Sequence, residues 1–170
     1  RTVIRATVLN TDSPAKVIQR VNELIVRDNR EGMFVTAIYG VLSLDSGSMI
    51  YSNAGHNPPI LISPKSEVGG FLNRTGPAIG VIPDFVIQER EIKLAKGDSL
   101  LMYTDGLTEA FSPEGLFFGL ESVEKLIRSS VYATPQELLD SLEVSLDTFT
   151  GFTPLADDLT MMVIHRKVGG

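Results

Sequence analysis

Cysteine is absent from the 170 residues of the sequence. This absence excludes a disulfide framework, a thiolate metal site and a cysteine nucleophile. No apolar run approaches the length that would cross a bilayer, and the N-terminus lacks the pattern of a signal peptide. We therefore predict a cytoplasmic location and no membrane contact in this segment.

Positive charge is scarce as well, because 15 Lys and Arg residues stand against 21 Asp and Glu residues, for a formal net charge of −6. This balance argues against a broad surface for nucleic acid or anionic membranes. It is equally unfavourable to a phosphorylated substrate, so an enzyme acting on phosphate would need a metal ion to offset the charge. Hydrophobic residues make up 43% of the chain, as in ordinary globular proteins, so we expect an ordered fold.

The length suits one domain with a substantial core, and neither a repeat nor an interdomain linker interrupts it. We therefore predict a single domain over residues 1–170. The first residue is Arg rather than Met, and Arg1–Asn10 has the composition of the end of a helix that starts further upstream. We expect the chain to be N-terminally truncated, without any sensor domain that precedes it.

Three further helices are predicted from the apolar pattern. The first starts after the N-cap Ser13, has Pro14 in its first position and ends near Asn29. The second covers residues 120–127, whose apolar side chains recur at helical spacing. The third opens with a capping-box pattern at residues 134–137.

Short apolar runs separated by Gly, Pro and Asp-Ser turns predict strands. The predicted strands are Phe34–Leu44, Met49–Asn53, Pro58–Ser63, pieces of Phe71–Pro83, Val86–Leu94, Ser99–Thr104 and Leu159–His165. The first of them is apolar on both alternating faces and is predicted to be buried between layers. Helices and strands in separate runs favour an α+β class over βαβ winding. We predict an antiparallel β-sandwich of two sheets packed face to face, flanked by helices.

Two carboxylates lie at the ends of the most apolar strands. Asp105 follows one strand and Asp157 precedes another, so antiparallel pairing of these strands would bring both to the same sheet edge. Oxygen ligands of this kind suit a hard cation. Gly106 would let the backbone turn sharply there, Asp158 is a second candidate ligand or support, and Thr160 could orient a carboxylate by a hydrogen bond.

Simpler interpretations stand beside this one. An Asp at a strand end is ordinary turn chemistry, although the pairing of two such residues favours the metal site. His56 lies in a Pro-rich loop, where a general acid or phosphate contact is possible. We favour a ring that hydrogen-bonds backbone in a tight turn, because no nucleophile lies nearby in the sequence. His165, in the last strand, is predicted to be structural.

Five segments in this order resemble the stage-II-sporulation-E-like branch of the PPM-type protein phosphatases, over nearly the whole chain. They are MFVT at 33–36 with Gly40-Val41, YSNAGHNPP at 51–59, GPAIG at 76–80, GDSLLMYTDGLTEA at 97–110 and DDLT at 157–160. The resemblance implies αββα layers and a two-metal manganese or magnesium centre at one edge of the sandwich, where a metal-activated water attacks phosphoserine or phosphothreonine.

Four residues match positions of that centre. Asp105 and Asp157 match family ligands, Asp158 matches a supporting position, and Gly106 matches the glycine beside the first ligand. The loop that contains His56 matches a family signature, but no catalytic role is carried onto this histidine, and none is assigned beyond the metal ligands.

The chain also departs from the family pattern, because the earlier Asp-Gly motif that bridges both metals in relatives is missing. We therefore expect a partial phosphatase domain with an incomplete site and little activity of its own. The resemblance implies a phosphorylated anti-sigma-factor antagonist as substrate. An exposed sheet edge also predicts a possible homodimer.

Three alternatives compete with this prediction. One is a non-catalytic, phosphatase-like binding module, which the missing motif keeps open. Another is a haloacid-dehalogenase-type phosphatase with Asp105 as nucleophile, which is disfavoured because Leu107 occupies the place of its second Asp. The third is a structural domain without a site.

Overall fold

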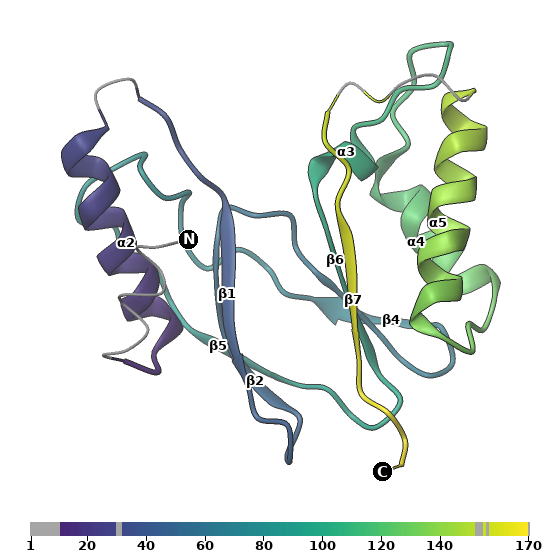
Figure 1. The fold of residues 1–170 in the computed structure, drawn as a ribbon, viewed down its shortest axis with the longest axis horizontal. Helices are drawn as coiled ribbons and strands as arrows, with labels where there is room; N and C mark the ends of the chain where they lie inside the picture. The colour runs from purple at the N-terminus through teal and green to yellow at the C-terminus, as the bar shows by residue number, and fades with distance from the viewer. Residues whose placement is uncertain (1–10, 30–31, 152–154, 156, 170) are drawn as a thin grey trace. The chain divides into compact units, whose positions relative to one another are not determined.

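The computed structural model describes residues 11–29, 32–151, 155 and 157–169. It divides the chain into two compact units, Arg1–Pro58 with Asn73–Leu94 and Pro59–Leu72 with Ala95–Gly170. Each unit has its own antiparallel sheet (Figure 1), and each has its own hydrophobic core. The predicted helix end at Arg1–Asn10 lies outside the described residues, and one functional domain over residues 1–170 stays a prediction.

The first unit contains α2 (Pro14–Asp28), whose start is as predicted. The side chain of Ser13 caps it by accepting a hydrogen bond from the Lys16 amide at 3.3 Å, and Pro14 follows. The buried face carries Val17, Ile18 and Val21. This face packs with apolar residues of the sheet and of the loops before β5, which form the core of the unit.

The sheet of the first unit has the order β1-β2-β5, with β1 (Ala37–Leu42), β2 (Ser48–Ala54) and β5 (Arg90–Lys93). The predicted hairpin is confirmed, with Ala37 opposite Ala54 and Leu42 opposite Met49. The prediction that the first strand is buried on both faces is wrong. As an edge strand β1 pairs only with β2 in the described sheet, and its residues are half-buried or exposed.

The predicted strand Val86–Leu94 is shorter than expected, because only β5 joins the ladder. Phe85 and Ile87 instead turn into the core of the first unit. The Gly- and Pro-rich stretch 71–83 contains isolated bridges, such as the one between Ile79 and Val35.

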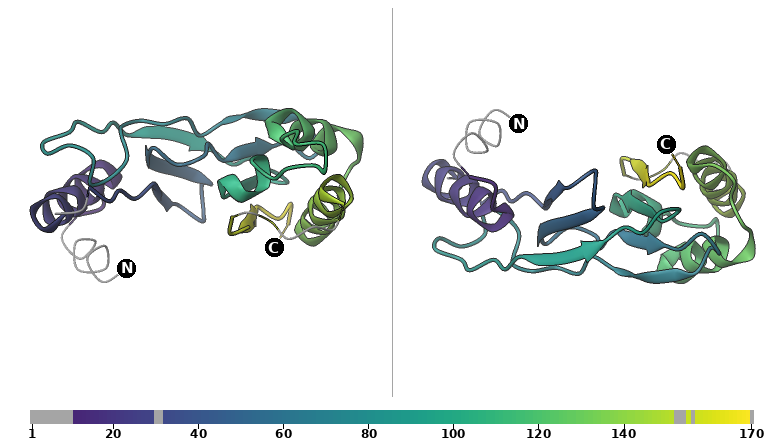
Figure 2. Two further views of the ribbon diagram at one scale, coloured as in Figure 1. Left: turned by 90° about the horizontal axis from the view of Figure 1, so that it is seen from above. Right: turned by 90° about the horizontal axis from the view of Figure 1, so that it is seen from below.

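The second unit has a four-stranded antiparallel sheet of order β4-β3-β6-β7. Its strands are β3 (Ile60–Ile62), β4 (Val68–Phe71), β6 (Ser99–Tyr103) and β7 (Met161–His165). One face meets α4 (Gly119–Ser129) and α5 (Pro135–Thr150), which lie together beside this sheet in both views of Figure 2. The core between them is largely apolar, with Leu101, Ile127 and Leu142 completely buried.

The predicted capping box of α5 is half confirmed. The Thr134 hydroxyl accepts a hydrogen bond from the Glu137 amide at 3.2 Å, but the Glu137 carboxylate reaches back to the Ala133 amide at 2.9 Å instead of the amide of the cap. A short helix, α3 (Asp105–Thr108), was not predicted. Helices and antiparallel sheets together give the predicted α+β class. Among the described helices, none is long and apolar enough to cross a membrane.

Candidate metal centre

Asp105 lies where β6 leaves the sheet of the second unit and begins α3. The backbone turns there through two hydrogen bonds, from the Leu107 amide to the Thr104 carbonyl at 3.1 Å and from the Glu109 amide to the Asp105 carbonyl at 2.7 Å. The completely buried side chain of Leu107 anchors this turn in the core. The Asp105 residue itself is exposed, so its carboxylate is held on a rigid support at the surface.

The register of β6 and β7 brings the second acidic segment to the same place. The strands are antiparallel, with Tyr103 opposite Met161. One residue further, the Thr104 amide donates to the Thr160 carbonyl at 3.0 Å. The exit of β6 therefore lies beside the entry of β7, as the sequence predicted, and Asp105 shares this end of the sheet with Asp157 and Asp158.

Gly106 packs closely where the two acidic segments, the one with Asp105 and the one with Asp157 and Asp158, lie side by side. A Cβ atom added to it would lie 2.6 Å from the Asp158 carbonyl oxygen and 3.3 Å from the Asp157 carbonyl oxygen. The reason predicted for this glycine, a sharp turn, is therefore corrected. Gly106 belongs to the helical turn of α3, and what requires glycine is the close contact with the neighbouring backbone.

A hydroxyl that the sequence analysis missed joins the two segments. The Thr104 Oγ1 atom donates to the Asp158 carbonyl at 2.9 Å and accepts from the Thr160 amide at 2.9 Å. Thr160, which was expected to orient a carboxylate, is bound to Thr104 through its backbone amide and carbonyl. The sequence feature that could have identified Thr104 is its place directly before Asp105-Gly106 at the end of a buried strand.

The Asp157 carboxylate is oriented locally. Its Oδ1 atom accepts a hydrogen bond from the Asp158 amide at 2.7 Å, and both residues are exposed. Oxygen donors suit Mg²⁺ and Mn²⁺, so the carboxylates of Asp105, Asp157 and Asp158 fit a hard cation in kind. They do not complete its ligand set, because within the described ranges no three His, Cys, Asp or Glu side chains are grouped closely enough to hold a metal ion.

The described side-chain contacts of the two histidines are with hydroxyl groups. In the first unit, the His56 amide donates to the Asn53 Oδ1 atom at 2.8 Å, and its Nδ1 atom lies 3.2 Å from the Thr36 hydroxyl. The tight turn is as expected and the ring Nδ1 atom meets a side-chain hydroxyl, while a bond from the ring to backbone stays a prediction. The His165 Nδ1 atom lies 3.0 Å from the Ser99 hydroxyl on the neighbouring strand, in agreement with a structural role.

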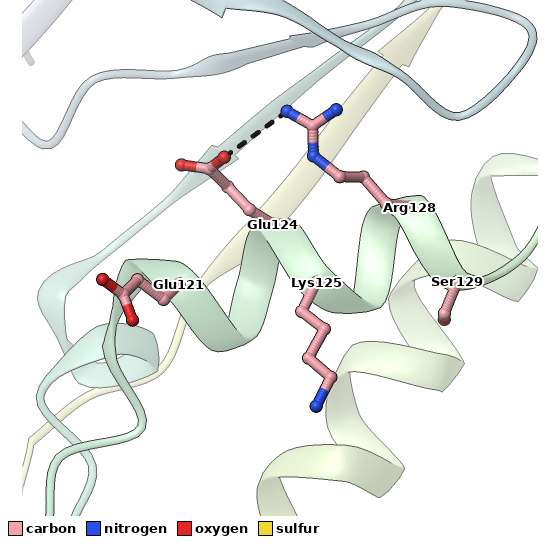
Figure 3. Close-up of a pocket in the computed structure, with 5 residues that line it drawn as sticks. All are labelled: Glu121, Glu124, Lys125, Arg128 and Ser129. Atoms are coloured by element: carbon pink, nitrogen blue, oxygen red, sulfur yellow. Dashed lines mark ion pairs between the residues drawn. The ribbon is translucent and has the colours of Figure 1, made fainter.

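A surface hollow on α4 offers a different group of charged side chains (Figure 3). Its lining residues are Glu121, Glu124, Lys125, Arg128 and Ser129. Arg128 and Glu124 are one helical turn apart, 3.6 Å from each other and partly exposed. A pair of this geometry is ordinary for a helix surface. We therefore prefer the site at Asp105, Asp157 and Asp158 to this hollow as the catalytic site.

Comparisons with known sequences agree with the motifs. The sequence model of the family described as Stage II sporulation protein E (SpoIIE) matches residues 1–167. The phosphoserine phosphatase RsbU of Bacillus subtilis is 29% identical over 155 residues, which are 91% of this chain and 46% of RsbU. The chain spans less than half the length of the curated relatives it matches.

Solved structures show the same fold. The PP2C domain of SiaA from Pseudomonas aeruginosa superposes with a TM-score of 0.79 at 18% identity, covering 96% of this chain and 66% of that one. The phosphatase domain of the cell fate determinant SpoIIE from Bacillus subtilis, presoaked with Mn, gives a TM-score of 0.67 at 17% identity, covering 99% and 72%. These likenesses confirm the predicted fold class.

Proposed function

Because the chain belongs to the Stage II sporulation protein E family, we propose that it acts in the metal-dependent hydrolysis of phosphoserine or phosphothreonine on a regulatory protein. The observation that carries this proposal is the β6–β7 register, which places Asp105 at the same end of the strand pair as Asp157 and Asp158. Exposed carboxylates on a buried, hydrogen-bonded support make a site where a cation can be held next to a substrate at the surface.

Asp105 and Asp157 would bind the metal, with Asp158 in support. Gly106 keeps the two segments in contact by leaving no side chain between them. The chemistry that Mn²⁺ or Mg²⁺ supplies at such a site is the activation of water and the offset of phosphate charge. No catalytic side chain beyond the ligands is proposed.

The ligand count limits what the described residues can do alone. A two-ion centre needs more donors than these three carboxylates supply. No complete metal cluster occurs in the described part of the chain. We therefore propose that further ligands come from outside the described residues. We expect these 170 residues alone to turn over substrate slowly.

For the substrate we propose a phosphorylated anti-sigma-factor antagonist in the cytoplasm. The support is similarity to RsbU and RsbP, both named phosphoserine phosphatases. The net charge of −6 argues against nucleic acid as a partner. A homodimer stays a prediction, for which the edge position of β1 is the structural support.

A non-catalytic binding module is the alternative, favoured by the incomplete ligand set. Titration calorimetry with Mn²⁺ separates the two. The proposal expects weak binding by the chain that is abolished by Asp105→Ala and Asp157→Ala. Asp147→Ala, at an exposed position of α5 and outside the β6–β7 pair, is the control and should bind like the unchanged chain. Absence of binding, or binding that survives Asp105→Ala, would support the binding module.

A further inference from the structure

We propose that Thr104 is a positioning residue that fixes the distance between the two acidic segments of the candidate metal centre. This inference rests on the proposed function, because its purpose is the arrangement of the ligands. Thr104 lies between the last residue of β6 and Asp105. It makes contact with the opposite segment through both its backbone and its side chain.

Three hydrogen bonds tie Thr104 to the segment that carries Asp157. Its amide donates to the Thr160 carbonyl at 3.0 Å. Its hydroxyl accepts from the Thr160 amide at 2.9 Å and donates to the Asp158 carbonyl at 2.9 Å. The hydroxyl therefore acts as donor and acceptor at once, which an apolar side chain of the same shape cannot do.

The hydroxyl extends the connection between the two segments beyond the β6–β7 ladder, where the Thr104 amide adds one backbone bond to Thr160. The ladder between β6 and β7 starts at the pair Tyr103 and Met161. Asp158 and Thr160 precede this ladder and belong to no strand. Beyond the ladder, Thr104 continues the connection between the strands by two side-chain bonds, up to the residues that carry the carboxylates.

The position of Thr104 at the start of α3 makes this use of its hydroxyl notable. A Thr at this position commonly caps its own helix by accepting a hydrogen bond from a backbone amide two or three residues later. The Thr104 side chain makes no such bond to α3. The helix start is closed through the Thr104 carbonyl, which accepts from the Leu107 amide. The hydroxyl thus serves the contact with the acidic segment instead of the helix.

Two hydrogen bonds connect the Thr104 hydroxyl, through Asp158, to the carboxylate of the proposed ligand Asp157. Thr104 binds the carbonyl of Asp158, and the amide of Asp158 binds the Asp157 Oδ1 atom at 2.7 Å. The same Asp158 carbonyl lies against Gly106. Loss of the hydroxyl would release the Asp158 carbonyl and leave the Thr160 amide without its acceptor. The Asp157 carboxylate would then occupy a wider range of positions relative to Asp105.

Thr104→Val removes the hydroxyl at nearly constant shape, and Thr104→Ser restores it. Thr148→Val is the matched control, because the Thr148 hydroxyl donates only within α5, to the Val144 carbonyl at 2.8 Å. All measurements use the 170-residue chain at a temperature at which circular dichroism shows each variant folded. The first readout is amide hydrogen exchange at Asp158 and Thr160 without metal, and the second is Mn²⁺ affinity by calorimetry.

We expect Thr104→Val to speed exchange of the Thr160 amide and to weaken Mn²⁺ binding about tenfold, the lower end of the range for residues that orient ligands. Thr104→Ser should return both readouts towards the unchanged chain, and Thr148→Val should alter neither.

Each contrary outcome has a distinct meaning. Unchanged exchange at Thr160 in Thr104→Val would overturn the proposed connection itself, whatever the metal does. Faster exchange with unchanged Mn²⁺ affinity would overturn the positioning role and leave the proposed function intact. If the unchanged chain binds no Mn²⁺, the proposed function fails, and the positioning role for a metal site is overturned with it even when the exchange result is as expected.

Discussion

Gly106→Ala tests how closely the two acidic segments must approach. The added Cβ atom would lie 2.6 Å from the Asp158 carbonyl oxygen and 3.0 Å from the Asp158 carbonyl carbon. Both atoms belong to the backbone, so the segment before β7 must move to make room. Overpacking of this kind costs about 1–3 kcal/mol. The reduced freedom of the unfolded chain offsets about 0.4–1 kcal/mol.

The expected net loss is therefore about 1–2 kcal/mol of unfolding free energy, or about 2–8 °C in the midpoint of thermal unfolding. Because the displaced backbone carries Asp157 and Asp158, Mn²⁺ binding should weaken as well. Thermal unfolding and titration calorimetry on the same samples measure the two effects.

Gly69→Ala is the matched control for this prediction. A Cβ atom there would lie 3.6 Å from the nearest atoms of Leu61, an ordinary contact, and Gly69 is exposed in β4 of the same unit. Its unfolding midpoint should stay within about 2 °C of the unchanged chain. If Gly106→Ala were as stable as Gly69→Ala and bound Mn²⁺ with unchanged affinity, the inferred close contact between Gly106 and the Asp158 backbone would be refuted.

Three further changes test the fold. Leu142→Ala empties a fully buried position in the core of the second unit and should lower the unfolding free energy by about 2–5 kcal/mol in urea. Thr134→Ala removes the N-cap of α5, which binds the Glu137 amide, and should cost about 1 kcal/mol in the same assay. Burial raises the pKa of Tyr51, against an opposing effect of Arg90. The folded pKa of Tyr51 lies above the unfolded one, so the folded state favours the neutral phenol. The contribution of this preference to the unfolding free energy is complete below pH about 10 and is lost as the pH rises through the folded pKa. Tyr51→Phe should therefore reduce the fall of unfolding free energy above pH about 10.

The controls for these changes lie on exposed positions of α5. Val144→Ala should cost less than about 0.5 kcal/mol, because its side chain is largely exposed, and a loss equal to that of Leu142→Ala would contradict the assigned core. Thr148→Ala should cost less than Thr134→Ala if capping is what stabilises the helix start. An unchanged pH slope in Tyr51→Phe would contradict the assignment of alkaline destabilisation to this tyrosine.

Local chemistry made several elements predictable from the sequence. Ser13 with Pro14 fixed the start of α2, and Thr134 fixed the start of α5, because caps depend on residues within one turn. The strands β6 and β7 were predictable from continuous apolar runs that end at Asp105 and begin after Asp157. Their pairing was a conditional expectation, which the register confirms.

Other features depended on contacts that the sequence does not reveal. The half-exposed state of β1 follows from its place at the edge of a sheet, and an apolar run does not distinguish an edge strand from a central one. The helical turn α3 is only four residues long and depends on the buried anchor Leu107. The close approach at Gly106 involves Asp158, which is 52 positions away in the sequence.

The same distinction applies to the candidate site. The proposed ligands of the cation, Asp105 and Asp157, could be predicted from the sequence, because ligand chemistry is a property of side chains. It assigned the orienting role to Thr160, whereas the structure gives the connecting hydroxyl to Thr104. Both threonines lie within two residues of an Asp near a strand end, and only the three-dimensional register decides which hydroxyl reaches across. The positioning role of Thr104 therefore depends on the pairing of β6 with β7, because its hydroxyl binds the backbone next to a ligand on the other segment.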